Sequence, residues 1–387
     1  MPCRWSLGIL INRRQPVLAV VLLTAMAMTA MAMADAAHAQ LASANDTARL
    51  LAGMQPASDS PLLVLTKERA WQEHANHFNS IFAKLKNRQI TRVQAWSRAR
   101  LTSPSPVLFY MFSGPDFLYA NAFFPNASIY VMSGLEPTGQ IPDVTKLSRE
   151  ARAHSYRNIQ QLLSSIVSYG FFQTIDMRHK LAAAGVTGTL PIIYVFLARS
   201  GKTIRDVSLI RLDENGTAQA DAGTGRDAES ASSARGVKID FVNEDGRLQT
   251  LYYFSTNVDN DSFKANGFAR FCESLGTGDA LVKSASYLMH RDRFSDVRNF
   301  LRDRSRLILQ DDSGVPVNWF DQASWQLRPF GHYSGPIALF ASRHQPKLSQ
   351  LFKQSDVEPI DFAIGYRISI SRKPSAVSDY CPPPLFP

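Results

Sequence analysis

Two short apolar runs, residues 107–112 and 128–132, each end in a Ser-Gly pair with an acidic residue shortly after it, Asp116 or Glu136. A segment rich in Phe, Leu, Tyr and Ala lies between the two runs and stops at Pro125. Apolar runs of this length, bounded by turn residues, predict strands, and the segment between them predicts a short helix. We therefore expect both carboxylates at the carboxyl ends of neighbouring strands, where open α/β sheets bind ligands.

Helical spacing of apolar residues governs several longer stretches. It predicts helices from residue 61 to about residue 100, where a pair of prolines follows, and from residue 145 to 184 with a break at Gly170. Shorter helices are expected at residues 261–275 and 347–353. These helices supply the layers that cover the predicted strands.

Strand patterns are frequent in the second half of the chain. Residues 237–242 and 248–256 flank an Asn-Glu-Asp-Gly turn and predict a hairpin. Residues 215–236 are poor in apolar residues and predict a mobile loop. The sequence thus predicts an α/β (α+β) fold, with a mixed sheet flanked by helices, in one globular domain over residues 61–387. Further strands are expected at residues 190–198, 207–212, 307–309 and 362–370.

The first residues have the pattern of a secretory signal. Arg13 and Arg14 precede an apolar run at residues 17–34, which leads to a small-residue end at Ala37-His38-Ala39. We expect residues 1–39 to be removed and residues 40–60 to form a flexible leader; an uncleaved anchor is the alternative. Both alternatives place the remainder in the periplasm or outside the cell, with no integral membrane span once the signal is gone.

Charge and cysteine content limit the classes of partner. The 42 Lys and Arg residues outnumber the 33 Asp and Glu residues, but they form no dense basic tract with aromatic residues between. Nucleic acid is therefore excluded as a partner, and a cell-envelope component or a small-molecule ligand is favoured. Cys272 and Cys381 are an even pair in an oxidising compartment, where they are able to form a disulfide.

The acidic turns offer two interpretations. The region superficially resembles the start of a Rossmann-type methyltransferase, but it has one glycine, Gly114, in place of a glycine run, and Asp116 puts negative charge at the phosphate position. No cofactor is assigned on this pattern. Paired carboxylates suit acid–base catalysis, whereas Asp116 equally suits the N-cap of the following helix.

Other polar clusters are weaker candidates. Residues 283–290 are expected to be helical, which places Ser286 and His290 on one face, either as a nucleophile and its base or as small contacts against the sheet. Asp311 and Asp312 are either a turn or oxygen ligands for a cation. The pair His74 and His77 has metal-ligand spacing but no third ligand nearby, so a structural role is preferred.

Aromatic residues gather in expected loops near the carboxyl end, among them Trp319, Phe320, Trp325, His332 and Tyr333. In an exported protein such loops suit contacts with carbohydrate or peptide, and they equally suit the cover of a core edge. The sequence does not separate these two roles.

Four sequence blocks carry a resemblance. SGPDFLYA at 113–120, GLEP at 134–137, KSASYLMH at 283–290 and LQDDSGVP at 309–316 resemble those of an uncharacterised exported bacterial family. The family carries no known activity, so the resemblance implies export, and no catalytic role transfers from it.

Two functions follow from the residues. The first is a hydrolase-like envelope enzyme in which Asp116 and Glu136 are the acid and base, and His290, Asp312 and Ser113 complete the site. The second is a non-catalytic protein that binds a ligand or serves the envelope structure, in which the same acids cap helices. Convergence of these side chains with His332 on one pocket favours the enzyme.

Overall fold

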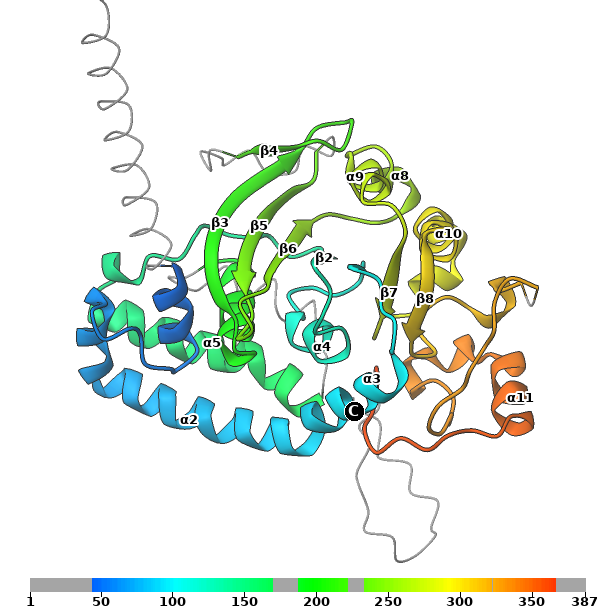
Figure 1. The fold of residues 1–387 in the computed structure, drawn as a ribbon, viewed down its shortest axis with the longest axis horizontal. Helices are drawn as coiled ribbons and strands as arrows, with labels where there is room; N and C mark the ends of the chain where they lie inside the picture. Colours follow the sequence, from blue (N-terminus) through cyan, green and yellow to red (C-terminus); the bar gives the residue numbers. More distant parts are fainter. Residues whose placement is uncertain (1–43, 170–186, 222–232, 322, 367–387) are drawn as a thin grey trace, which may run out of the picture.

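A single eight-stranded sheet runs through the part of the chain that the computed structural model describes, residues 44–169, 187–221, 233–321 and 323–366 (Figure 1). Its strand order is β4-β3-β5-β6-β2-β1-β7-β8. Neighbouring strands from β6 to β8 are parallel, and those from β4 to β6 are antiparallel, so the sheet is mixed as the sequence predicts. The strands are β1 (Val107–Tyr110), β2 (Ile129–Gly134), β3 (Thr203–Leu212), β4 (Ala218–Ala220), β5 (Arg235–Val242), β6 (Leu248–Ser255), β7 (Gly278–Val282) and β8 (Ser305–Gln310).

Helices cover both faces of the sheet (Figure 1). The first face carries α2 (Arg69–Leu85), α3 (Thr91–Arg100), α4 (Phe117–Phe123), α5 (Arg149–Tyr169) and α7 (Leu190–Arg199). The second face carries α8 (Asn260–Phe263), α9 (Phe268–Ser274) and α10 (Ser295–Arg304), and α11 (Pro346–Gln354) lies beyond β8. Short helical turns are η1 (Pro61–Lys67), η2 (Lys86–Ile90), η3 (Val144–Lys146), η4 (Leu288–His290), η5 (Asp292–Phe294), η6 (Val317–Trp319) and η7 (Ala338–Arg343).

The central strands divide their side chains between two cores. Leu108 and Tyr110 of β1 point into the core under the first layer of helices, and Val107 and Phe109 point into the core under the second. Successive side chains of a strand lie on opposite faces, so a strand covered on both faces needs apolar residues throughout. This explains the continuous apolar run in the sequence at β1.

The expected strand–helix–strand unit is confirmed as β1, α4 and β2, with β1 parallel to β2. The hairpin of residues 237–256 is confirmed as β5 and β6, with Val242 opposite Leu248 across the turn. The strand at residues 307–309 is confirmed within β8, and the helix at residues 347–353 within α11. Local sequence patterns are therefore sufficient to predict an element when its burial follows from its own residues.

The strand predicted at residues 190–198 is wrong, because this stretch forms helix α7 with Pro191 in its first turn. Every residue of α7 from Leu190 to Ala198 is buried. A helix surrounded by protein on all sides has no polar stripe, so periodicity does not distinguish it from a buried strand. Proline in the first turn is the local signal for a helix.

Three further expectations differ from the structure. Residues 283–290 are not a helix, because β7 ends at Val282 and a turn follows before η4. Residues 362–366 form no strand, and the rest of that predicted strand lies outside the described residues. Residues 44–51, expected in a flexible leader, are helical, and Leu50 and Leu51 are fully buried in the first core.

Several expectations fall partly or wholly on residues that the structure does not describe. They include the signal at residues 1–39, the break at Gly170 and the partner cysteine Cys381. Cys272 is a fully buried thiol, and its burial raises the pKa of that thiol. Because Cys381 lies outside the described residues, the disulfide stays a prediction. The predicted loop at residues 215–236 contains the short edge strand β4. No helix within the described ranges is both long and apolar enough to cross a bilayer.

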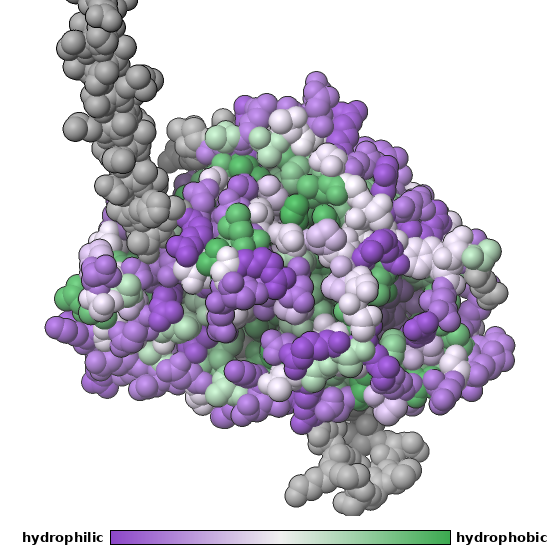
Figure 2. Space-filling view, in the orientation of Figure 1, coloured by the Kyte–Doolittle hydropathy of each residue, from purple (hydrophilic) through white to green (hydrophobic). Residues whose placement is uncertain are grey.

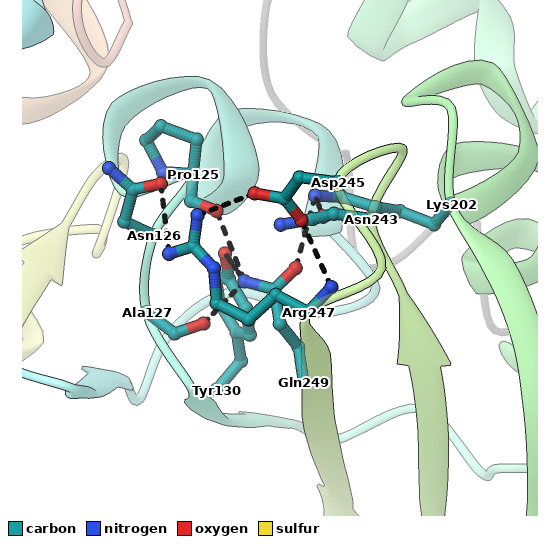
Figure 3. A network of polar contacts seen from close by, with 9 residues as sticks. All are labelled: Pro125, Asn126, Ala127, Tyr130, Lys202, Asn243, Asp245, Arg247 and Gln249. Carbon is teal, nitrogen blue, oxygen red and sulfur yellow. Dashed lines mark hydrogen bonds and ion pairs between the residues drawn. The ribbon is translucent and has the colours of Figure 1, made fainter.

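A polar network joins the two halves of the sheet at the amino ends of β2 and β6 (Figure 3). Gln249 Nε2 donates to the carbonyl oxygens of Pro125 at 3.1 Å and Ala127 at 2.5 Å, and Gln249 Oε1 accepts from Lys202 Nζ at 3.1 Å. Arg247 of the β5–β6 turn donates to Asn126 at 3.3 Å. Because these bonds tie the hairpin to the loop after α4, the edge opposite the carboxyl ends is fixed by structural contacts.

Candidate functional site

The chain changes direction across the sheet at the carboxyl ends of β1 and β7. The connection from β1 to β2 runs through α4 on the first face, whereas the connections into and out of β7 run through α9 and α10 on the second face. Strands whose connections leave on opposite faces have a crevice between their carboxyl ends, and ligands of α/β proteins bind there. The segments that follow β1 and β7 are therefore the first place to search for a site.

Asp116 occupies this crevice as the N-cap of α4. Its Oδ1 accepts from the backbone N–H of Tyr119 at 3.2 Å, and its Oδ2 accepts from the hydroxyl of Tyr110 at 3.0 Å. Lys283, the first residue after β7, places Nζ 2.9 Å from Oδ2. The side chains of Asp116 and Lys283 are each only 2% exposed, so this is a buried ion pair across the crevice.

Burial raises the pKa of the Asp116 carboxyl, and the ammonium of Lys283 with the hydrogen-bond donors of Tyr119 and Tyr110 acts against that rise. The Lys283 ammonium also lies 4.4 Å from the centre of the Tyr119 ring, where a cation is attracted to the ring face. Several donors thus converge on one carboxylate, which favours its ionised form. Asp116 is the N-cap of α4, as one interpretation of the sequence predicts. The sequence did not predict the lysine beside it.

The turn after β7 has a strained backbone. Ser284, Ser286 and Tyr287 have φ values of 56°, 54° and 55°, in the left-handed region that costs a residue with a side chain about 1–3 kcal/mol. These are the only positive-φ residues other than glycine among the described residues. Backbone strain of this kind gathers at functional sites, where surrounding contacts hold it.

Hydrogen bonds to other segments hold the turn, which is defined here as residues 284–287. The N–H of Ser284 donates to Asp311 Oδ2 at 2.8 Å, and the N–H of Ala285 donates to Ser313 Oγ at 2.7 Å. The N–H of Ser286 donates to the Tyr366 hydroxyl at 2.9 Å, and the Tyr287 hydroxyl donates to Asp312 Oδ2 at 2.7 Å. The loop after β8, together with Tyr366, therefore fixes the loop after β7.

These contacts decide the role of Asp311. Its Oδ1 accepts from the backbone N–H of Ser313 at 2.9 Å and from the Ser313 hydroxyl at 2.5 Å, while Oδ2 serves Ser284. An aspartate whose two oxygens bind backbone and hydroxyl donors is a turn residue. No group of three His, Cys, Asp or Glu side chains suited to a metal ion occurs within the described residues. Asp312 and the His74–His77 pair therefore belong to no such group there.

Ser113 and Glu136 lie near Asp116 in the loops that follow β1 and β2. The Ser113 hydroxyl donates to the carbonyl oxygen of Gly114 at 2.7 Å. Glu136 is 2% exposed, and its carbonyl oxygen accepts from the Tyr253 hydroxyl at 2.8 Å. A methyl group added to Gly134 would lie 2.5 Å from Glu136 Oε2 and 2.9 Å from the Cα of Gly114, so the two loops pack tightly together.

His290 and Asp312 form a second group around Tyr287. The His290 ring centre lies 5.1 Å from the Tyr287 ring centre, and Asp312 accepts from the Tyr287 hydroxyl. Burial lowers the pKa of His290 to about 4, so the ring is neutral at pH 7. Ser286 directs its hydroxyl to the Tyr366 hydroxyl at 2.7 Å, so the proposed contact of Ser286 with His290 on a helix face does not exist.

A cavity of about 830 Å³ lies beside β8 and is called the β8 cavity here. Figure 2 shows the surface hollowed in the part of the view where Figure 1 places β8 and the segment after it. Residues Arg306 to Gln310 of β8 line one side, and Leu348, Leu351 and Phe352 of α11 line another. The aromatic loop residues Phe320, Trp325, His332 and Tyr333 line it as well, as does Trp96 of α3.

One group of polar side chains of the β8 cavity lies where β8 ends, and charged side chains such as Arg328, Asp356 and Glu358 line other parts of it. Tyr287, Asp311, Asp312 and Tyr366 line the cavity where β8 ends, so the strained turn is part of the wall. Asp116, Glu136, Ser113 and His290 do not line the cavity. The structure therefore separates the predicted site residues: Asp312 and His332 line the cavity, and the other four do not. No local sequence pattern indicated that β8 is an edge strand or that apolar residues of α11 line a cavity beside it.

Comparison of the chain with protein-family models, with curated proteins and with solved structures gives no match. The resemblance of the four sequence blocks to an exported bacterial family stays a prediction.

Proposed function

We propose that this chain is an exported protein that binds a ligand in the β8 cavity. Export is supported by the basic and apolar pattern of residues 1–39. Binding is supported by the cavity volume of about 830 Å³, because ligand sites in proteins have volumes of roughly 300–1,000 Å³. Lys283 of the buried ion pair with Asp116 directly precedes the turn of residues 284–287, and Tyr287 of this turn lines the cavity.

The observation that carries the proposal is a cavity with both apolar and polar walls, in which a fixed group of polar side chains lies where β8 ends. The hydroxyl groups of Tyr287 and Tyr366 and the carboxylate of Asp312 lie there, and their hydrogen bonds to each other and to the strained backbone turn hold them in place. Apolar walls supply affinity and a few fixed polar groups supply orientation. A surface that only covers the core has no need of such a group.

The proposal predicts that the apolar fluorescent dye anilinonaphthalene sulfonate (ANS) binds the folded protein in this cavity. Leu348→Glu places a charge in the apolar wall and is expected to weaken ANS binding about tenfold or more, because burial of an unpaired carboxylate is costly. Fluorescence titration measures the affinity. Leu339→Glu is the matched control, since Leu339 is 67% exposed and does not line the cavity. Absence of ANS binding, or equal loss in both variants, would contradict the proposal.

The hydrolase-like enzyme is the second candidate, and the position of Asp116 favours it. Asp116 lies at the crevice where α/β proteins place ligands, its pKa is raised, and the loops of Asp116 and Glu136 are in contact at Gly114 and Gly134. Asp116→Asn and Glu136→Gln test this candidate side by side. Hydrolysis of nitrophenyl esters or glycosides that falls at least a hundredfold in both folded variants would support the enzyme. Unchanged hydrolysis, or none in the native chain, together with a lower unfolding midpoint would assign the acids to structure.

A further inference from the structure

The outer edge of β8 is open within the part of the chain that the structure describes. Among the described strands, β8 is the last of the sheet and pairs only with β7. The N–H of Asp311 donates to the carbonyl oxygen of Val282 on β7 at 3.1 Å. Backbone groups alternate in direction along a strand, so Leu309 also faces β7, and the N–H and C=O of Ile308 and Gln310 face the β8 cavity.

The two faces of the sheet beside this edge are both apolar. Leu307 and Leu309 pack against the first core, together with Ile360 and Ile364, and Ile308 packs against the second core, together with Trp325 and Leu327. All of these residues line the β8 cavity. A strand added to β8 would direct alternate side chains to these two faces, and each would meet an apolar surface.

Charged side chains line the cavity on several sides, and β8 itself has an exposed arginine near its amino end and two aspartates directly after its carboxyl end. Arg306, the second residue of β8, donates to the carbonyl oxygen of Ser103, which follows the end of α3, so Arg100 and Arg306 lie at the amino end of the strand. Arg100 pairs with Glu358, whereas the Arg306 side chain is 52% exposed and lies 3.7 Å from Asp279. Asp311 and Asp312 lie at the carboxyl end of β8. An extended chain that runs antiparallel to β8 places its amino end near the aspartates and its carboxyl end near the arginines.

On these grounds we propose that the β8 cavity binds a short extended peptide as a ninth strand, antiparallel to β8, with a free carboxylate toward Arg306. This inference rests on the proposed function of the β8 cavity and names the class of ligand. β8 has six residues, and a strand rises about 3.3 Å per residue, so the groove fits a peptide of about four to six residues. A peptide is favoured over carbohydrate because the outward groups of β8 repeat at the spacing of a peptide backbone.

The test uses a synthetic series of hexapeptides with alternating Val, Ile, Tyr and Phe, a lysine at the amino end and free termini, titrated against the full chain by fluorescence anisotropy. The best binder is then N-methylated at one position at a time. Methylation is expected to weaken binding at least tenfold at alternate positions, whose N–H groups face β8, and to have little effect at the positions between. A period of two distinguishes strand addition from a contact through side chains alone.

The direction in which the peptide lies along β8 is tested by changes to the peptide and to the protein. Amidation of the peptide carboxylate is expected to weaken binding several-fold to the native chain, and Arg306→Gln is expected to abolish the difference between the acid and the amide. Arg304→Gln is the matched control, because Arg304 is exposed and does not line the β8 cavity. If Arg306→Gln unfolds the protein, the amidated peptide on the native chain still decides the point.

Three outcomes would overturn the peptide proposal. The first is that no hexapeptide binds at millimolar concentration although ANS binds, which leaves the cavity as a site for another class of ligand. The second is that N-methylation shows no period of two. The third is a concentration-dependent dimer in sedimentation that competes with peptide, which assigns the edge to a second copy of the chain. Absence of both ANS and peptide binding would instead contradict the proposed function itself.

Discussion

Replacement of Lys283 with methionine is expected to lower the free energy of unfolding by about 3–5 kcal/mol. The Lys283 ammonium lies 2.9 Å from the Asp116 carboxylate, and both side chains are 2% exposed. Removal of the cation leaves a carboxylate buried without its charge partner, and loss of one member of a buried pair costs more than the pair contributes. Chemical denaturation of the purified protein measures the change.

Two variants control this measurement. Lys264→Met removes a lysine that is 68% exposed and lies 3.0 Å from Asp296, and an exposed pair is expected to contribute at most about 1 kcal/mol. The double variant Asp116→Asn/Lys283→Met removes both charges and is expected to recover a large part of the stability lost in Lys283→Met. A loss in Lys283→Met no larger than that in Lys264→Met would show that water reaches the pair.

Acidification from pH 7 to pH 4 is expected to destabilise the protein through His74 by about 3 kcal/mol. Burial lowers the pKa of His74 from 6.5 to about 4 in the folded state. The unfolded chain therefore takes up a proton between these values while the folded chain does not. The stabilisation is complete above pH 6.5, falls as the pH is lowered, and is gone below about pH 4.

The contacts of His74 explain why it stays neutral. Its Nε2 lies 2.8 Å from the carbonyl oxygen of Leu51, which assigns the proton to Nε2, and its Nδ1 lies 3.0 Å from Gln160 Nε2, which donates to it. His74→Gln keeps a donor for Leu51 and removes the titration, so its unfolding free energy is expected to depend less steeply on pH. His77→Gln is the control, because His77 is exposed. Equal pH dependence in both variants would assign the destabilisation to other groups.

The sequence predicted the unit of β1, α4 and β2 because the residues that signal it are close together in the chain. Gly114 has a φ of 51°, in a turn that a glycine reaches without strain, and Asp116 caps the helix directly after it. The hairpin of β5 and β6 followed from an alternating pattern around a four-residue turn in the same way. In both cases the residues that decide the structure are close together in the chain.

The position of the site depended on contacts between distant segments. Lys283 meets Asp116 only because β7 is inserted beside β1, and the turn after β7 keeps its left-handed residues because Asp311, Ser313 and Tyr366 supply the hydrogen bonds. The helical expectation for residues 283–290 failed for this reason, since a pattern of Ser, Ala and Tyr carries no signal of such partners.

The sequence by itself determined the fold class, the elements around β1 and the kinds of side chain available for chemistry, because burial and turn formation act on neighbouring residues. Only the tertiary structure decided that α7 is a helix, that Asp116 is neutralised by Lys283, and that the aromatic loops form a cavity against β8. The physical reason is that strand order sets which side chains become neighbours, and strand order arises from the packing of the whole sheet.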